Sequence, residues 1–387
     1  MNLRTGNYRE GRPRAVKPRA LLLSLDYAPQ TGGQPRLITA IVEATADMVD
    51  WKVITAAPGA PDERVVRAGG MRSMVTQTLR ARRWLDAADD RLVVSAHAYL
   101  GPLAHVVGLL SKAPVSTLCY GRELVPANLA HRLALSTLRL DHKVVTISRH
   151  SQDVVRGLGV KPQHSAWVGC ELKPRFTRPG DPSPRTQAGL HAVAVTRLCE
   201  GYKNLEVTLR AVALLVADGT VEHYTIVGDG PRRASLQRRI DRLGLGEHVT
   251  LAGRLDDRQL GDLLQTAHVG LFPSRVSRAE GGFEGFGIVV QEFAAAGLPV
   301  IVGDVGGAGD AARTEWAKLV QPDDLAAWVD ALDELARDEP LRMSMAQAAH
   351  RFGQTLDTAT TARSFLDALR GVPAPTPISR RNLLGVN

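Results

Sequence analysis

The chain has 387 residues, of which 44% are hydrophobic and 23% charged, with a formal net charge of +8. This balance is typical of a globular protein and excludes a disordered or fibrous chain. The length favours two domains over a single hydrophobic core. No apolar run is long enough to span a bilayer, and LLLSL at 21–25 is too short for the core of a signal peptide.

The three cysteines, Cys119, Cys170 and Cys199, are far apart and form no CxxC motif or Cys/His cluster. Their spacing favours free thiols over disulfides or a structural zinc site, and it predicts a reducing, cytoplasmic location. Aromatic residues make up 5% of the chain, and no basic stretch is interleaved with them. Binding to nucleic acid is therefore not expected.

Residues 1–19 carry six basic side chains and a single acid, Glu10. We expect a flexible basic tail here. Two interpretations stay open: an arm that contacts anionic lipid at the inner face of a membrane, or a tail that is only solvated.

After this tail, apolar β-branched runs alternate with helical patterns up to residue 176. Strands that are apolar on both faces indicate a parallel sheet covered by helices, so residues 20–176 are predicted to form one α/β domain. The predicted strands of this domain are 20–29, 51–57, 91–98, 113–121 and 143–148.

Residues 171–189 contain four prolines, two glycines and no apolar period, and we place an interdomain linker at 177–190. The pattern then restarts and ends in two helical stretches, 323–338 and 341–370. The predicted strands of this second domain, which we expect to span 191–372 before a tail at 373–387, are 192–198, 222–230, 248–254, 268–274 and 298–304.

The predicted fold class is α/β, with two Rossmann-like, doubly wound parallel-sheet domains facing a central cleft. Ligands of such sheets bind outside the carboxyl ends of the strands.

The stretch EGFGIVVQE at 284–292 follows one of these predicted strand ends. A helix is expected to begin near Gly287 or Ile288. Good helix formers precede Gly297, which suits the left-handed position after a helix, and Pro299 stops the helix.

Glu284 would then lie in the loop before this helix, and Glu292 on the helix itself. Glycines let the backbone approach a ligand closely, and the free N–H groups at a helix start attract phosphate. Glu292 is placed to accept hydrogen bonds from a pair of hydroxyls such as those of a ribose. The alternative is that both carboxylates only favour a helix N-terminus electrostatically.

The order of motifs favours the ligand-binding interpretation. VTRLCEGYKNLEVTLRA (195–211) is followed by IVGDGP (226–231), then by the two glutamates with seven residues between them, then by GLPVIVGDVGG (297–307). In this order the chain resembles the retaining glycosyltransferases of family 4, which have the GT-B fold. The resemblance extends more weakly into the first half.

In that first half the resemblance rests on the Gly32–Gly33 loop, on His97 within SAHA, and on YGRE at 120–123. It implies that Gly33 offers a backbone N–H to the donor from the opposite domain. His97 occupies a histidine position of the family and is a candidate catalytic residue, although a lone histidine at a strand end is often structural.

The resemblance implies a site for a nucleotide diphosphate sugar in the second domain. Arg197 and Lys203 would neutralise the diphosphate, because the leaving group gains charge as the glycosidic bond breaks. Backbone around Arg254 and Leu255 would edge the nucleobase. Glu284 would contact the donor sugar.

The same resemblance assigns the ribose to Glu292. The backbone between the two glutamates would bind the diphosphate, through Gly285, Phe286, Gly287 and Ile288.

The family's mechanism is a front-face attack in which the departing phosphate takes the acceptor's proton. It implies no metal and no cofactor. The chain contains no Asp-x-Asp, the usual ligand set of metal-dependent GT-A enzymes. The adjacent aspartates at 89–90, 256–257 and 323–324 are better explained as charges at helix N-termini.

Three positions depart from the family pattern. Tyr120 stands where many members have histidine, and tyrosine can donate a hydrogen bond but cannot carry a proton charge at neutral pH. Glu171 and Asp310 replace other acidic residues of the family.

The loop at 275–282 resembles that of mannosyltransferases acting on phosphoinositol lipids, which hints at GDP-mannose.

The expected function is a hexosyltransferase that uses a UDP- or GDP-sugar. Its hydroxyl acceptor would be a glycolipid, a polysaccharide intermediate or a small natural product, and peripheral contact with a membrane fits the first of these. The alternative is a non-catalytic nucleotide-sugar-binding subunit with the same fold, which Tyr120 leaves open.

Overall fold

The protein is described here by a computed structural model that covers residues 17–30, 32–60, 62–176, 189–277 and 282–372. Most of the basic tail at 1–19, most of the linker, half of the 275–282 loop and the tail from 373 lie outside these ranges. Predictions made for those segments stay predictions.

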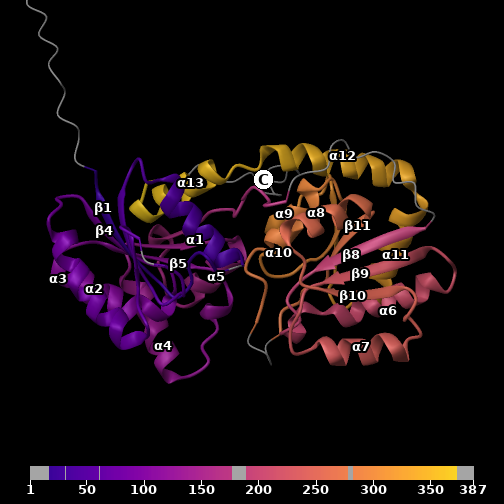
Figure 1. Ribbon diagram of the computed structural model, residues 1–387, viewed down its shortest axis with the longest axis horizontal. Coiled ribbons are helices and arrows are strands. Elements are labelled where there is room, and N and C mark those ends of the chain that lie inside the picture. Colours follow the sequence, from indigo (N-terminus) through magenta and orange to yellow (C-terminus); the bar gives the residue numbers. More distant parts are fainter. Residues whose placement is uncertain (1–16, 31, 61, 177–188, 278–281, 373–387) are drawn as a thin grey trace, which may run out of the picture.

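Two parallel sheets form the framework, one in each half of the chain (Figure 1). The first has the strand order β3-β2-β1-β4-β5-β6-β7, and the second has the order β10-β9-β8-β11-β12-β13. Every pairing between neighbouring strands is parallel. Both sheets are therefore doubly wound, and the predicted fold class is confirmed.

The strands of the first sheet are β1 (Arg19–Ser24), β2 (Asp50–Thr55), β3 (Val65–Arg67), β4 (Arg91–Ser95), β5 (Val115–Cys119), β6 (Lys143–Thr146) and β7 (Ser165–Trp167). Those of the second sheet are β8 (Leu190–Val195), β9 (Val221–Val227), β10 (Val249–Gly253), β11 (Val269–Phe272), β12 (Val300–Gly303) and β13 (Ala317–Val320).

Helices cover both faces of each sheet. Those of the first half are α1 (Gly33–Ala44), α2 (Met71–Asp86), α3 (Gly101–Ser111), α4 (Leu129–Ser136) and α5 (Arg149–Gly157), with short 3₁₀ turns η1 (Ala98–Leu100), η2 (Arg122–Leu124), η3 (Thr137–Leu140) and η4 (Pro162–His164).

The second half contains η5 (Gly201–Lys203), α6 (Leu205–Val216), α7 (Arg233–Arg242), α8 (Asp257–Thr266), α9 (Ile288–Ala295), α10 (Ala308–Ala311), α11 (Leu325–Arg337), α12 (Glu339–Thr355) and α13 (Thr358–Arg370).

The last helix returns to the first half of the chain. Figure 1 shows α12 along the second lobe and α13 beside α1 of the first. Phe365 and Leu369 of α13 are buried in one apolar cluster with Leu37 and Ile41 of α1. The predicted extent of the second domain, 191–372, is therefore wrong for this helix. An amphipathic pattern shows that a helix covers a sheet, but not which sheet it covers.

The two lobes touch where the loop before α9 meets the end of β5. A Cβ atom added to Gly285 would lie 1.7 Å from the backbone oxygen of Tyr120, so only a glycine allows this approach. Phe286 and Val290 belong to the same apolar cluster as first-lobe residues such as Tyr120. The structure thus holds the two lobes together at the carboxyl ends of their strands.

Candidate active site

The strand order places a binding crevice in each sheet. In each sheet the chain first adds strands towards one edge and then towards the other. This reversal of strand order falls between β1 and β4 in the first lobe and between β8 and β11 in the second. Ligands of doubly wound sheets bind at such points, beyond the carboxyl ends of the strands. The segments that follow these four strands contain the predicted residues Gly33, His97, Arg197 and Glu284.

Lys203 and Glu284 form a largely buried ion pair at this edge of the second sheet. Lys203 Nζ lies 2.5 Å from Glu284 Oε2, and the two side chains are only 12% and 18% exposed. Burial opposes the charge on Lys203, but Glu284 and Tyr202 together outweigh it, so the pKa of Lys203 is raised above its usual value. The site therefore contains a lysine that stays charged at neutral pH.

Arg197 lies at the mouth of the same region. Its guanidinium is 3.4 Å from Glu200, and its side chain is 69% exposed. Arg122 from the first lobe reaches the same Glu200 oxygen at 3.2 Å. Arg197, Glu200 and Lys203 together line a pocket of about 260 Å³. The Glu200 carboxylate thus contacts an arginine from each lobe, Arg122 and Arg197, next to Lys203.

The helix predicted after Glu284 is confirmed. It is α9, preceded by Gly287 in the left-handed conformation with φ 87°, and Gly297 beyond its end has φ 70°. The start of α1 faces it from the other lobe, because a Cβ atom on Gly33 would lie 2.9 Å from the Cδ1 atom of Ile288. Two helix N-termini, with their free N–H groups, therefore meet across the interface.

Glu292 is on α9, as predicted, and its carboxylate is bound by Arg36 of the first lobe. Arg36 Nη1 lies 2.6 Å from Glu292 Oε1, and both side chains are largely buried. Arg36 also donates to the backbone oxygen of Lys173. The ribose contact of Glu292 stays a prediction, and Arg36 positions its carboxylate.

Replacing Arg36 with alanine should release Glu292 and raise the KM for the donor by about 10-fold, the cost of about one charge-assisted hydrogen bond. The value of kcat should change much less, since Arg36 acts through Glu292. Arg36→Lys keeps the charge and should restore part of the loss. Steady-state kinetics with varied donor measure this. An unchanged KM in Arg36→Ala would exclude the positioning role.

His97 and Tyr120 lie together at the strand ends of the first sheet. The Nε2 atom of His97 is 3.3 Å from Asp26, and this close contact with His97 lowers the pKa of that carboxyl group. The rings of His97 and Tyr120 are 5.7 Å apart at their centroids. Burial raises the pKa of Tyr120 well above its usual value, so its hydroxyl stays neutral.

Arg254 and Leu255 directly follow β10, two strands away from β8 in the second sheet. Arg254 is exposed, whereas Leu255 is half-buried against the apolar core. Both therefore lie on the ligand-binding edge of the same sheet as Lys203. Their expected role at the nucleobase stays a prediction.

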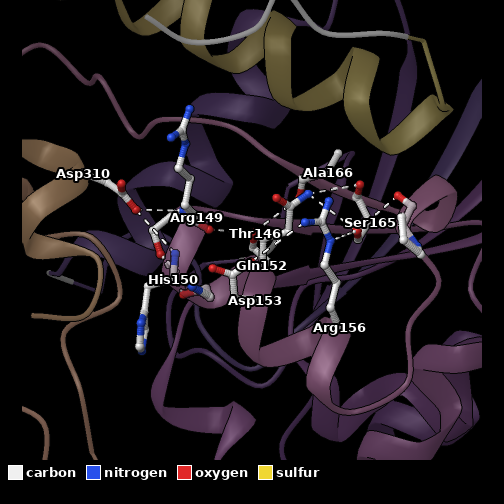
Figure 2. Close-up of polar contacts among 12 residues, drawn as sticks. Thr146, Arg149, His150, Gln152, Asp153, Arg156, Ser165, Ala166 and Asp310 are labelled. Atoms are coloured by element: carbon white, nitrogen blue, oxygen red, sulfur yellow. Dashed lines mark hydrogen bonds and ion pairs between the residues drawn. The ribbon is translucent and has the colours of Figure 1, made fainter. Parts of the chain in front are cut away.

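The two acidic residues that depart from the family pattern both join the lobes. Figure 2 shows Asp310 at the start of α5, where its Oδ2 atom accepts hydrogen bonds from the backbone N–H groups of Arg149 (2.8 Å) and His150 (3.4 Å). An acid from one lobe thus caps a helix of the other. Glu171 pairs with Arg313 at 3.1 Å.

Of the aspartate pairs, Asp256 and Asp324 cap α8 and α11 as predicted. Asp89 and Asp90 instead lie in the turn between α2 and β4, so the helix-cap prediction is wrong for them. Within the ranges that the structure covers, no three potential metal ligands come together. In the same ranges no helix combines the length and apolarity needed to cross a membrane.

Sequence reasoning missed Arg36 and Glu200. Arg36 is on the first turn of the helix after the Gly32–Gly33 loop, and Glu200 is the one acid between the two predicted cations. Both positions could have been singled out, because each places a charge next to a predicted ligand-binding segment.

The second lobe matches a known family model. Residues 191–352 match the family model described as glycosyl transferases group 1. A D-inositol 3-phosphate glycosyltransferase of Streptomyces scabiei is 29% identical over 288 residues, which are 69% of this chain and 63% of the relative. The chain thus aligns with less than two thirds of that relative's length.

A second relative aligns almost completely. The GDP-mannose-dependent alpha-(1-6)-phosphatidylinositol monomannoside mannosyltransferase of Mycobacterium tuberculosis is 27% identical over 393 residues, covering 91% of this chain and 98% of the relative.

Solved structures resemble the whole fold. HepE of Anabaena in complex with UDP and glucose has a TM-score of 0.73 at 19% identity, covering 91% of this chain and 99% of that one. Sucrose-phosphate synthase of Thermosynechococcus elongatus has a TM-score of 0.72 at 18% identity, covering 92% and 98%. At these identities the likeness shows the fold alone. The chain therefore has the predicted GT-B fold, and its residues 191–352 match the model of the group 1 glycosyl transferases, in agreement with the predicted resemblance.

Proposed function

We propose that this protein is a retaining, metal-independent glycosyltransferase that moves a hexose from a nucleotide diphosphate sugar to a hydroxyl group. The observation that carries this proposal is the buried Lys203–Glu284 pair, 2.5 Å apart, just before α9 and next to the first lobe. A charged lysine beside a helix N-terminus suits a diphosphate, and a carboxylate beside it suits sugar hydroxyls.

In this proposal the diphosphate lies between the starts of α1 and α9, with Lys203 and Arg197 against its oxygens. These fixed cations stabilise the charge that develops on the departing diphosphate as the bond to the sugar breaks. The departing phosphate takes the proton of the acceptor hydroxyl on the same face of the sugar, so the anomeric configuration is retained. Closure of the lobes excludes water and suppresses donor hydrolysis.

GDP-mannose and an inositol-containing lipid are the first substrates to test. The relative that aligns over 98% of its length is GDP-mannose-dependent and acts on a phosphatidylinositol monomannoside. A solved neighbour contains UDP and glucose, so UDP-sugars belong in the same screen. The described cysteines are free, which supports a reducing, cytoplasmic location.

A thermal-shift screen of UDP- and GDP-sugars tests the donor, followed by transfer assays with lipid, polysaccharide and small-molecule acceptors in the presence of EDTA. We expect one nucleotide series to raise Tm, and the product to keep the donor's anomeric configuration by NMR. Donor binding with neither transfer nor slow hydrolysis would instead support a non-catalytic nucleotide-sugar-binding subunit. A Tm unchanged by every nucleotide would contradict both interpretations.

A further inference from the structure

Exposed large apolar side chains gather on one part of the first lobe. The described residues include twelve such side chains, and seven of them lie between residues 99 and 140. The seven, with their exposed fractions, are Tyr99 (46%), Val106 (51%), Leu109 (82%), Leu110 (46%), Leu129 (72%), Leu133 (61%) and Leu140 (72%). We call these seven residues the apolar patch.

The patch follows helical spacing. Val106, Leu109 and Leu110 are three and four residues apart on α3 and form one exposed stripe, while Ala104 and Val107 bury the opposite face. A surface helix normally exposes polar residues to solvent. Helix α3 instead exposes an apolar stripe, which is unusual for a helix that faces only water. Leu129 and Leu133 repeat the pattern at i, i+4 on α4.

The elements that carry the patch touch one another. Helix α3 packs against α4 and η3, and α4 packs against η1. The ring of Tyr99 on η1 stacks on His131 of α4, with centroids 4.2 Å apart. The seven side chains therefore belong to one contiguous part of the lobe, where Figure 1 shows α3 and α4 on the side away from α13.

Within the segment that carries the patch, the exposed charged side chains have one sign. Residues 98–148 contain two acids, Glu123 and Asp141, which are only 5% and 3% exposed. Glu123 accepts hydrogen bonds from the backbone of Tyr120 and Gly121, and Asp141 is 2.7 Å from His105. The exposed cations of the same segment are Lys112, Arg132 and Arg139, together with Arg122, which pairs with Glu200 at the candidate site.

We infer that the apolar patch is a docking surface for an anionic lipid bilayer. Apolar side chains flanked by cations, with no exposed carboxylate among the described residues of 98–148, match a surface that is apolar inside and uniformly negative outside. Each lysine or arginine near such a surface contributes attraction, which salt screens. A protein partner would offer both signs of charge, and this segment has no exposed acid to meet its cations.

The patch adjoins the candidate active site. Tyr99 follows His97 by two residues, and Arg122 follows Tyr120 by two. Docking at this face would present a lipid-borne hydroxyl to the edge of the cleft. Docking itself is argued from the surface alone, and only this link to a lipid acceptor rests on the proposed function.

Co-sedimentation of the full-length protein with vesicles tests the inference. We expect binding to vesicles of phosphatidylcholine mixed with phosphatidylglycerol, weak binding to phosphatidylcholine alone, and a loss of binding at high salt. The double variant Leu109→Glu/Leu133→Glu should lower the partition coefficient at least about 10-fold, since burying even one leucine is worth that factor. The matched control, Leu214→Glu, changes a leucine on α6 that is 56% exposed and should bind as the wild type does.

All variants keep residues 1–16, so the basic tail contributes equally to each. Equal vesicle binding by the double variant and the wild type would overturn the inference. The inference would also be overturned if light scattering showed a dimer for the wild type and a monomer for the double variant, because the patch would then be a self-association surface. If the double variant does not fold, Arg132→Glu/Arg139→Glu tests the same surface by charge reversal. Nucleotide binding by each variant separates a failure of docking from a failure of the proposed function.

Discussion

Replacing Lys203 with methionine is expected to lower the affinity for a nucleotide diphosphate by about 10- to 100-fold. This corresponds to the loss of one or two charge-assisted hydrogen bonds to the phosphates. The change also leaves Glu284 without its partner at 2.5 Å, in a place where it is only 18% exposed. We therefore expect a fall in the free energy of unfolding of about 1–3 kcal/mol, less than for a fully buried pair. Calorimetry and chemical denaturation measure the two effects.

The chain offers a matched control in another Lys–Glu pair. Lys318 Nζ lies 2.7 Å from Glu334, with side chains 23% and 50% exposed. Because that pair is closer to solvent, Lys318→Met should cost less than about 1 kcal/mol and leave nucleotide affinity unchanged. If Lys203→Met and Lys318→Met bind nucleotide equally well, Lys203 is not the diphosphate cation.

Gly285→Val is expected to lower the transfer rate by more than about 100-fold while changing nucleotide affinity far less. The added Cβ atom would lie 1.7 Å from the backbone oxygen of Tyr120, so the two lobes cannot reach the contact seen here. A misplacement of about 1 Å between reacting groups already costs about two orders of magnitude in rate. Small-angle X-ray scattering should show a larger radius of gyration, and steady-state assays should show the lower kcat.

Gly246→Ala is the matched control for this variant, because a Cβ atom on Gly246 meets nothing within 4 Å. It should leave both the radius of gyration and the rate unchanged. Wild-type rates in Gly285→Val would show that the close approach of this loop to the first lobe is not needed for transfer.

Most of the fold could be predicted from the sequence, because buried parallel strands leave uninterrupted apolar runs. Every strand of that kind was found, including Leu190–Val195 and Val300–Gly303. The strands β3, β7 and β13 were missed because each is only three or four residues long and only partly buried. The position of α13 was missed for a different reason: its partner α1 is distant in sequence, and no local pattern records the pairing.

The candidate site could likewise be predicted only in part from the sequence. Motif order placed Lys203 and Glu284 in one predicted site, and the start of α9 followed from local glycine and proline signals. The partner of Glu292 could not be predicted, because it depends on how the two lobes meet. Arg36 and Glu292 are 256 residues apart. The pairing of Glu292 with a cation is thus a property of the interface between the two lobes, whereas the pairing of Glu284 with Lys203 lies within the second lobe.

The most direct test of this account is a crystal structure of the protein with a bound nucleotide diphosphate. We predict that the diphosphate lies at the start of α9, with its oxygens within hydrogen-bond distance of Lys203 Nζ and of the Arg197 guanidinium. A nucleotide bound elsewhere, or one whose phosphates contact neither of these cations, would contradict the proposed site.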